Sequence, residues 1–309
     1  MNQTKLLLRT ALGPAIGGTS YLVAQYLPPS PYWDAVLRAA PAGLLLLAIK
    51  PALPKGMWWW RSLVVGALNI GFFFGLLFVS AQRLSSGVSA TIGALSTLFA
   101  IGFSVPVLRE RIRPAQYIAA VIGVCGVALL VFRGDSSLDA IGVLAGLGSA
   151  LSLGLGGVLS RRWGRPEGIG GVTFASWTLL GGGVILLPIA LLAEGAPPSI
   201  SLSQFGGLLW VAFGCSALAY YLLLSGLQAL PISLSASLPL LGPVSAGFFG
   251  WLIAGETLAP LQLLGGAIVL ASVLAATWPR KPKASPEAVP DAPSTAVNSA
   301  PVVPLADRR

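Results

Sequence analysis

Long apolar runs dominate this sequence and limit it to folds that place their backbone in a lipid bilayer. About ten windows of 18 or more residues carry few or no charges, and at a rise of about 1.5 Å per residue each can cross a hydrocarbon layer of about 30 Å. Membrane-spanning strands would instead alternate apolar and polar residues over about 10 positions, a pattern that the sequence does not show. The runs therefore predict an all-α membrane protein with ten transmembrane helices.

Composition excludes a water-soluble alternative. Hydrophobic residues make up 55% of the chain and charged residues only 9%, whereas a soluble domain needs about a quarter of its residues charged. The ten spans are predicted at residues 5–26, 34–49, 62–81, 87–107, 115–132, 139–159, 170–192, 205–226, 232–255 and 260–277. Residues 279–309 are rich in Pro, Ala and Ser and lack aromatic residues, so they are predicted to form a disordered cytoplasmic tail.

Basic residues set the predicted orientation. With ten crossings and a cytoplasmic amino terminus, most of the 19 Lys and Arg residues fall on the cytoplasmic side, as the positive-inside rule requires. The net charge of +9 is then explained by topology and anionic lipid, so no nucleic-acid partner is expected. Both termini are predicted to be cytoplasmic.

The chain contains two copies of one unit. An offset of 146 residues, the separation between Glu110 and Glu256, also superimposes Pro114 on Pro260 without a gap. Roughly one position in four is identical over about 50 residues, which indicates an internal duplication. The two units are predicted at residues 1–135 and 136–278.

An odd number of spans in each unit would invert the second unit relative to the first. With five spans per unit, Glu110 falls on the cytoplasmic side and its counterpart Glu256 on the opposite side. Inverted repeats of this kind form the central binding sites of secondary transporters, which expose the site to each face in turn. The chain is therefore predicted to be a secondary transporter.

Residues suited to catalysis and metal binding are scarce. The sequence has no histidine, which excludes Ser-His and Cys-His nucleophile pairs and histidine metal sites. We expect no catalytic residue, no metal and no cofactor. The ten acidic residues fall at span ends, in loops or in the tail, so the sequence favours downhill facilitation over coupling to a proton or sodium gradient.

Arg38 is the basic residue that lies clearly within a predicted span. A charged side chain there indicates a functional site, and its partner could be a substrate carboxylate or Asp34, four residues earlier. The alternative is a structural arginine that extends to the membrane interface or binds free carbonyl groups. The sequence leaves both interpretations open.

Helix-breaking residues occur at matching points of the two units. Pro239 and Pro243 interrupt the ninth span, and the offset pairs them with Gly93 and Thr97 in the fourth. Breaks there free backbone groups where a site between inverted repeats would use them, so the four residues are candidate hinges beside the binding cavity. A simple packing kink is the alternative.

Aromatic and polar residues complete the candidate substrate site. We expect the aromatic residues to form a stacking wall and the polar residues to hydrogen-bond an amino-acid-like head group. The aromatic set is Phe74, Phe78, Phe174, Trp177, Tyr220 and Tyr221. The polar set is Arg38, Asn69, Gln82, Ser89, Thr91 and Ser237.

Several motifs resemble the drug/metabolite transporter superfamily. Glu110-Arg111 and Glu256-Thr257 are each followed by a proline and a glutamine, and the second span carries Leu37-Arg38-x-x-Pro41-Ala42-Gly43-Leu44. Over residues 5–278 the chain is similar to the ten-helix EamA-type exporters, and Phe174-Ala-Ser-Trp177 is similar to bacterial aromatic amino-acid exporters. The resemblance implies export of small metabolites across the inner membrane through a cavity between the repeats.

The predicted function is export of small metabolites, with aromatic and other amino acids as the first candidates, by alternating access around a central cavity. An exporter of drugs, sugars or nucleosides with the same fold is one alternative, and a membrane channel or scaffold is another. The expected partners are a small-molecule substrate and the lipid bilayer, and a monomer fits the sequence.

Overall fold

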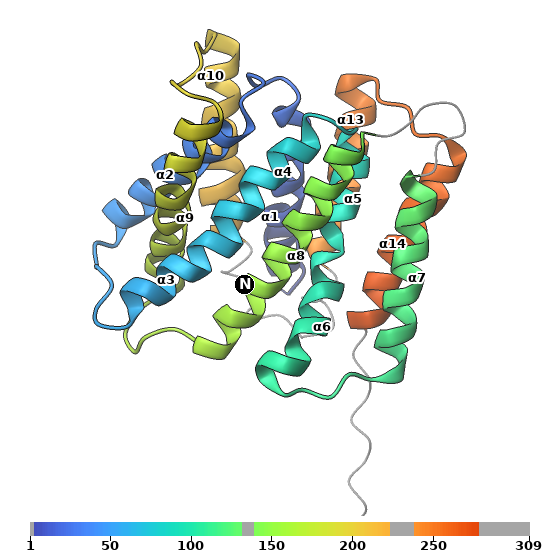
Figure 1. The fold of residues 1–309 in the computed structure, drawn as a ribbon, viewed down its shortest axis with the longest axis horizontal. Helices are drawn as coiled ribbons and strands as arrows, with labels where there is room; N and C mark the ends of the chain where they lie inside the picture. Colours follow the sequence, from blue (N-terminus) through green and yellow to red (C-terminus); the bar gives the residue numbers. More distant parts are fainter. Residues whose placement is uncertain (1–2, 132–138, 223–237, 278–309) are drawn as a thin grey trace, which may run out of the picture. The chain divides into compact units, whose positions relative to one another are not determined.

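Every regular element that the structure describes is a helix. A computed structural model describes residues 3–131, 139–222 and 238–277, and Met1–Trp278 form one compact unit (Figure 1). These ranges contain no β-strand, which confirms the prediction of an all-α protein. The predicted tail at residues 279–309 lies outside the described residues.

The described elements follow one another along the chain with short connections. In the first half they are α1 (Gln3–Ala24), α2 (Pro31–Ile49), α3 (Trp58–Gly66), the π-helical η1 (Ala67–Phe72), α4 (Phe73–Ala81), α5 (Ser86–Ala94), α6 (Ser96–Leu108) and α7 (Pro114–Val131). In the second half they are α8 (Ala140–Trp163), α9 (Gly171–Ala193), α10 (Leu202–Leu209), the π-helical η2 (Trp210–Leu218), the 3-10 helix η3 (Leu238–Leu240), α13 (Leu241–Ala254) and α14 (Pro260–Thr277).

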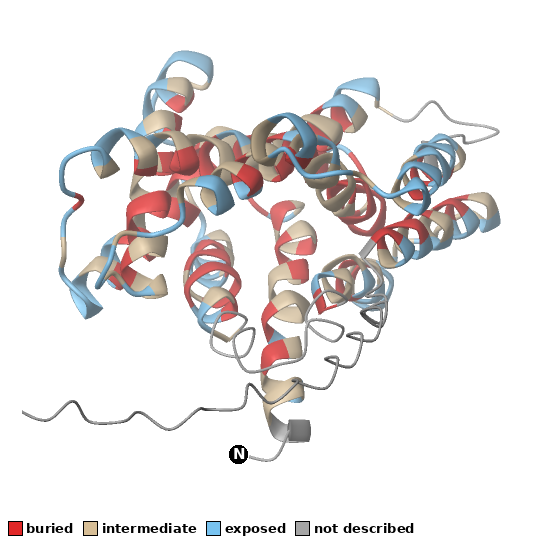
Figure 2. Ribbon diagram, turned by 90° about the horizontal axis from the view of Figure 1, so that it is seen from below, coloured by how far each residue is buried: buried red, intermediate tan, exposed pale blue. Residues whose placement is uncertain are grey.

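Six of the described helical segments are long and apolar enough to cross a membrane. They are Pro31–Ile49, Trp58–Ala81, Ser86–Leu108, Ala140–Trp163, Gly171–Ala193 and Leu202–Leu222. Three shorter apolar helices are Pro114–Leu129, Leu238–Ala254 and Pro260–Ala276. Leucine and tryptophan side chains such as Leu192, Leu202 and Trp251 are exposed, and Figure 2 shows that the exposed residues gather at the periphery of the bundle. An apolar periphery of this extent suits contact with lipid.

Where the structure describes both ends of a predicted span, the limits agree to within a few residues. The third span is the most informative difference, because it was expected to begin at residue 62 and the helix begins at Trp58. The Ser62 hydroxyl donates to the carbonyl of Trp58, so the serine lies inside the first turns and does not cap them. The tryptophans of residues 58–60 are therefore helical.

Two of the long segments contain a π-helical stretch that the sequence did not predict. The segment Trp58–Ala81 contains η1, and the segment Leu202–Leu222 contains η2. The offset of 146 residues pairs Asn69 in η1 with Cys215 in η2, so both halves carry the irregularity at the same point. A π-turn adds a residue to the turn and moves the following side chains to a different face, and such turns are frequent at functional sites.

The α6–α7 and α13–α14 connections have the same backbone conformation. α6 ends at Arg109 and α13 at Gly255, both left-handed, with φ of 57° and 64°. In each connection the next amide donates to the carbonyl six residues earlier, at 3.3 Å from Glu110 and 3.1 Å from Glu256. Figure 1 shows the two connections at opposite ends of the bundle. Matching stretches of sequence therefore fold alike and lie at opposite ends.

Helices of the two halves pack against each other. α7 lies along α14, α2 lies along α9, and α1 contacts α13 (Figure 1). The approach of α1 to α13 depends on Gly18, because a Cβ atom there would overlap the carbonyl of Gly242. The largest hydrophobic cluster includes Phe74, Phe78 and Leu186, which are buried where α4, α2 and α9 meet. This cluster supports the cavity beside it.

Candidate functional site

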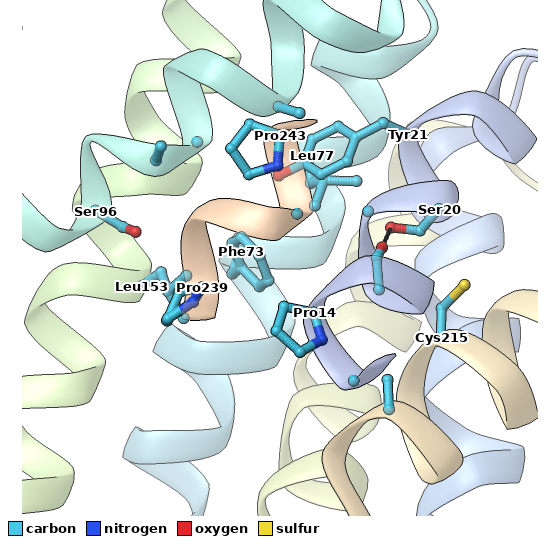
Figure 3. Close-up of a pocket in the computed structure, with 18 of the residues that line it drawn as sticks. Pro14, Ser20, Tyr21, Phe73, Leu77, Ser96, Leu153, Cys215, Pro239 and Pro243 are labelled. Carbon is cyan, nitrogen blue, oxygen red and sulfur yellow. Dashed lines mark hydrogen bonds between the residues drawn. The ribbon is translucent and has the colours of Figure 1, made fainter. Parts of the chain in front are cut away.

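A cavity of about 240 Å³, here called the central cavity, is lined by both halves of the chain (Figure 3). Its walls come from α1, α2, α4, α5, α6, α8, η2 and the segment from η3 into α13. Pro14, Phe73 and Leu77 contribute apolar surface, and Tyr21 and Ser96 contribute hydroxyl groups. The cavity can therefore hold a ligand that is mostly apolar with a few polar groups.

All four candidate hinge residues line the central cavity. Gly93 and Thr97 lie on either side of Leu95, where α5 stops and α6 starts. Pro239 and Pro243 lie on either side of the change from η3 to α13. The helix breakers matched by sequence therefore coincide with interruptions that face one cavity, and their role as hinges stays a prediction.

Arg38 reaches the central cavity from α2 and is only 4% exposed. Its Nε donates a hydrogen bond to Oγ of Ser216 at 3.0 Å. Its guanidinium carbon lies 3.9 Å from the ring centroid of Phe74 and 5.9 Å from that of Phe78. Three of the predicted site residues therefore form one cluster, in which a cation is held by two aromatic rings and a hydroxyl group.

Asp34 is not the ion-pair partner of Arg38 in this structure. The described residues form no ion pair between these two side chains, and Oδ2 of Asp34 instead accepts a hydrogen bond from Nε2 of Gln82 at 2.8 Å. Gln82 also donates to the carbonyl of Pro28 at 3.0 Å. Gln82 is therefore engaged at the start of α2 and is not among the residues that line the central cavity.

A second cavity of about 740 Å³, here called the wide cavity, adjoins the central cavity and shares Leu153 and Tyr220 with it. Three further members of the predicted site line it, namely Asn69, Phe174 and Tyr221. Tyr220 is thus the predicted residue that faces both spaces. The predicted site residues divide between two neighbouring cavities.

Basic residues line the wide cavity. Arg161, near the end of α8, and Arg165, just beyond it, contribute to the wall, and Nη2 of Arg161 lies 2.8 Å from a carboxylate oxygen of Glu110. The hydroxyl of Tyr221 accepts a hydrogen bond from Arg9 at 3.1 Å. The wide cavity therefore lies at the end of the bundle that carries the α6–α7 connection.

Trp177 lines neither the central nor the wide cavity. Its indole N–H donates to the carbonyl of Ala52 at 2.7 Å, so the connection between α2 and α3 satisfies its polar group. Its ring packs edge-on against Phe174, with 6.5 Å between centroids. Trp177 therefore contacts the wall of the wide cavity through Phe174.

The remaining polar candidates bind within or between helices. Ser89 donates to Oγ of Ser80 at 2.8 Å, and Thr91 donates to the carbonyl one turn earlier at 2.7 Å. Thr91 also lines a third cavity, of about 590 Å³, which Pro243 borders as well. Ser237 lies outside the described residues.

Two residues beside Arg38 were not predicted, namely Ser216 and Tyr21. Ser216 fixes the guanidinium through its hydroxyl, and Tyr21 lines the central cavity. The available signal was the duplication, because the offset pairs Asn69 with Cys215 and so marks the same depth in both halves. The register of the π-helical η2 then brings Ser216 to Arg38, which no periodic pattern reveals.

The described residues offer hydrogen-bonding groups but no cluster for a metal ion. No three His, Cys, Asp or Glu side chains come together in this part of the chain. The polar atoms that face the central cavity are a guanidinium and hydroxyl groups of serine, threonine and tyrosine. These groups suit a ligand with hydrogen-bond acceptors.

Comparisons with known proteins agree with this geometry. The sequence matches the EamA-like transporter family over residues 6–132 and 140–278. It is 37% identical over 263 residues to the protein PecM of Dickeya dadantii (strain 3937), covering 84% of this chain and 88% of PecM. It is 28% identical over 284 residues to the uncharacterized inner membrane transporter YedA of Escherichia coli (strain K12), covering 88% of this chain and 92% of YedA.

A solved crystal structure has a similar fold. It superposes with a TM-score of 0.61 at 17% sequence identity, covering 89% of this chain and 96% of that protein. At this identity the likeness concerns the fold alone.

Proposed function

The chain belongs to the EamA-like transporter family and is a multi-pass membrane transporter, and we propose that it exports small metabolites, with aromatic and other amino acids as the first candidates. Family membership supplies the class of activity. The direction of transport and the substrate are proposed from the residues of the central cavity.

The proposed architecture is ten membrane crossings in two inverted five-helix units, at residues 1–135 and 136–278. It is supported by the matching α6–α7 and α13–α14 connections at opposite ends of the bundle. It is also supported by the contact of α7 with α14, which the offset of 146 residues relates to each other. Basic residues favour an orientation with both termini in the cytoplasm, across the inner membrane.

One observation carries the proposal of alternating access. The helix breaks of both units, at Gly93 and Thr97 and at Pro239 and Pro243, face the same cavity. A carrier of inverted repeats needs such a shared site, with interruptions that allow each unit to move around it. A channel or a scaffold has no need of two matched breaks beside one enclosed space.

The size and lining of the central cavity favour small ligands with an apolar body. Its volume of about 240 Å³ lies just below the range of about 300–1,000 Å³ that is usual for ligand pockets. Phe73, Phe74, Tyr21 and Tyr220 place aromatic rings around it. An aromatic metabolite would find stacking surfaces there. No acidic residue lines it among the described residues, which fits the proposed downhill facilitation.

Counterflow in proteoliposomes tests the proposal. Vesicles that contain the purified chain are loaded with one unlabelled compound from a panel of amino acids, organic acids, sugars and nucleosides, and uptake of the labelled form is followed. A carrier transiently concentrates the label because it exchanges the two forms, whereas a channel only equilibrates it. Protein-free vesicles are the control. Equilibration without a transient overshoot for every compound that enters would contradict the carrier mechanism.

A further inference from the structure

The guanidinium of Arg38 has more hydrogen-bond donors than the described residues use. A guanidinium carries five N–H groups, and the side chain makes one hydrogen bond, from Nε to Ser216. Its Nη1 is buried and has no partner among the described residues. Burial of an uncompensated cation is costly, so the cluster of Arg38, Ser216 and Phe74 is incomplete without an anion.

The acidic side chains of the described chain are engaged elsewhere. Asp34 accepts from Gln82, Glu194 from the amides of Tyr32 and Trp33, and Glu256 from Ser86, while Glu110 and Asp139 pair with Arg161 and Arg83. Glu167 is exposed in the connection after α8. None of them lines the central or the wide cavity. The sequence of residues 223–237 contains no Asp or Glu. A ligand ammonium group would therefore find no carboxylate in either cavity.

Positive charge extends from the central cavity into the wide cavity. Arg161 and Arg165 line the wide cavity, which meets the central cavity at Tyr220 and Leu153. A cleft lined by one sign of charge attracts ligands of the opposite sign. Both cavities therefore favour an anion over a cation.

The geometry around Arg38 suits a planar anion. The Ser216 hydroxyl and the Phe74 ring fix the plane of the guanidinium, and its free N–H groups can bind a carboxylate through two parallel hydrogen bonds. Aromatic rings at Phe73, Tyr21 and Tyr220 complete the walls.

We infer that the transported ligands are small organic monoanions whose carboxylate binds Arg38 and whose apolar body lies among the aromatic rings. The inference rests on the proposed function and sharpens it. A free amino group contributes no charge-specific contact, so aromatic carboxylic acids without an amine are substrates at least as good as aromatic amino acids. Amines without a carboxylate are excluded.

Three matched probes test this in the unaltered protein. Phenylalanine carries both charged groups, phenylpropanoate lacks the amine, and phenylethylamine lacks the carboxylate. In counterflow we expect phenylpropanoate to exchange at least as fast as phenylalanine, and phenylethylamine at least about 100-fold more slowly, because a buried arginine left unpaired is strongly unfavourable. Exchange of phenylethylamine at the rate of phenylalanine would overturn the inference, as would exchange of phenylalanine with rejection of phenylpropanoate.

Substitution of Arg38 assigns the selectivity to one residue. Arg38→Gln is expected to lower exchange of phenylpropanoate by about 100-fold or more, and Arg38→Lys, which keeps the charge and loses the planar fork, by about 10-fold. Arg61→Gln is the matched control, because Arg61 packs on Trp58 and Trp60 and lines neither cavity. An Arg38→Gln protein that is folded, by size-exclusion chromatography, and still prefers the acid over the amine would overturn the assignment.

The outcomes separate the inference from the proposed function. If no compound of the wider panel shows counterflow, the carrier proposal itself fails. If sugars, nucleosides or amines show counterflow and the two acids do not, the carrier proposal stands and the inference is wrong.

Discussion

The two matching connections of the chain have one backbone conformation and different surroundings. At the α13–α14 connection, both carboxylate oxygens of Glu256 accept from the amide of Ser86, at 2.9 and 3.0 Å, and Oε1 also accepts from the Ser86 hydroxyl and from Gln25. At the α6–α7 connection, Glu110 pairs with Arg161 in an exposed ion pair at 2.8 Å. The same motif thus joins three helices at one end of the bundle and lies at the surface at the other.

This difference shows how one motif can serve two states. Ser86 is the first residue of α5, so Glu256 binds a helix amino terminus, where backbone amides and the helix dipole favour an anion. Gln25 brings the end of α1 into the same contact. The opposite end opens into the wide cavity, whose wall includes the Arg161 that pairs with Glu110. Under the proposed cycle, the structure corresponds to a state closed at the Glu256 end and open at the Glu110 end.

The largest effect is expected from Glu256→Gln. An amide cannot replace the charged acceptor that binds Ser86 and Gln25, and hydrogen bonds to a charged group contribute about 1.5–3 kcal/mol, so closure at this end weakens by about 10- to 100-fold. Cys215 lines the central cavity and serves as the reporter, in a Cys125→Ser background. Alkylation of Cys215 by a membrane-impermeant maleimide, added on the Glu256 side, should accelerate accordingly.

Glu110→Gln is the matched control for that experiment. Its side chain is 42% exposed and its partner Arg161 is 69% exposed, and exposed ion pairs contribute about 0–1 kcal/mol. The alkylation rate should therefore change by no more than about 5-fold. Equal effects of the two substitutions would show that the contrast between the ends has no consequence for access.

The sequence predicted the parts of this comparison that depend on local chemistry. Helix type followed from apolar length, and the duplication identified the matching connections and the helix breaks at Gly93 and Pro239 that face the cavity. It did not predict the contacts that join distant segments. The bond from Arg38 to Ser216 spans 178 residues and depends on the π-helical register of η2, and Trp177 was expected at the cavity but binds the Ala52 carbonyl. Periodicity describes one helix at a time and carries no information on such partners.

A moderate effect is expected when the helix break of the second unit is removed. Pro239→Ala with Pro243→Ala restores two backbone N–H groups and allows α13 to extend toward η3, so the α-helical form gains up to about 3 kcal/mol per site. We expect counterflow to slow by about 10-fold while the folded protein stays in the membrane, because the unit loses its flexible point. Pro188→Ala in α9, away from the central cavity, is the control. Normal rates in the double variant would remove the hinge role from these prolines.

The smallest effect concerns a second contact at the closed end, between Asp139 and Arg83 at 2.6 Å. The hydrogen bond from Arg83 lowers the pKa of Asp139, with help from the amides of Gly142 and Ile141 at the start of α8. Because the pKa is lower in the folded protein, the contact stabilises at every pH above the unfolded value of about 3.9 and is lost as the pH falls through the folded value. Its exposure keeps the contribution small.

Asp139→Asn isolates that contribution and asks whether Glu256 holds the closed end alone. The amide still caps α8 but carries no charge for Arg83, so the variant should lose slightly in Tm at pH 7 and the difference from the unaltered protein should vanish near pH 3. Cys215 alkylation from the same side at pH 7 should stay within about 2-fold of the unaltered rate, since an exposed pair contributes little. A larger acceleration would mean that Arg83, three residues before Ser86, transmits the Asp139 contact to the amino terminus of α5. The clasp would then consist of both carboxylates, and the contrast between the two connections would extend to α8.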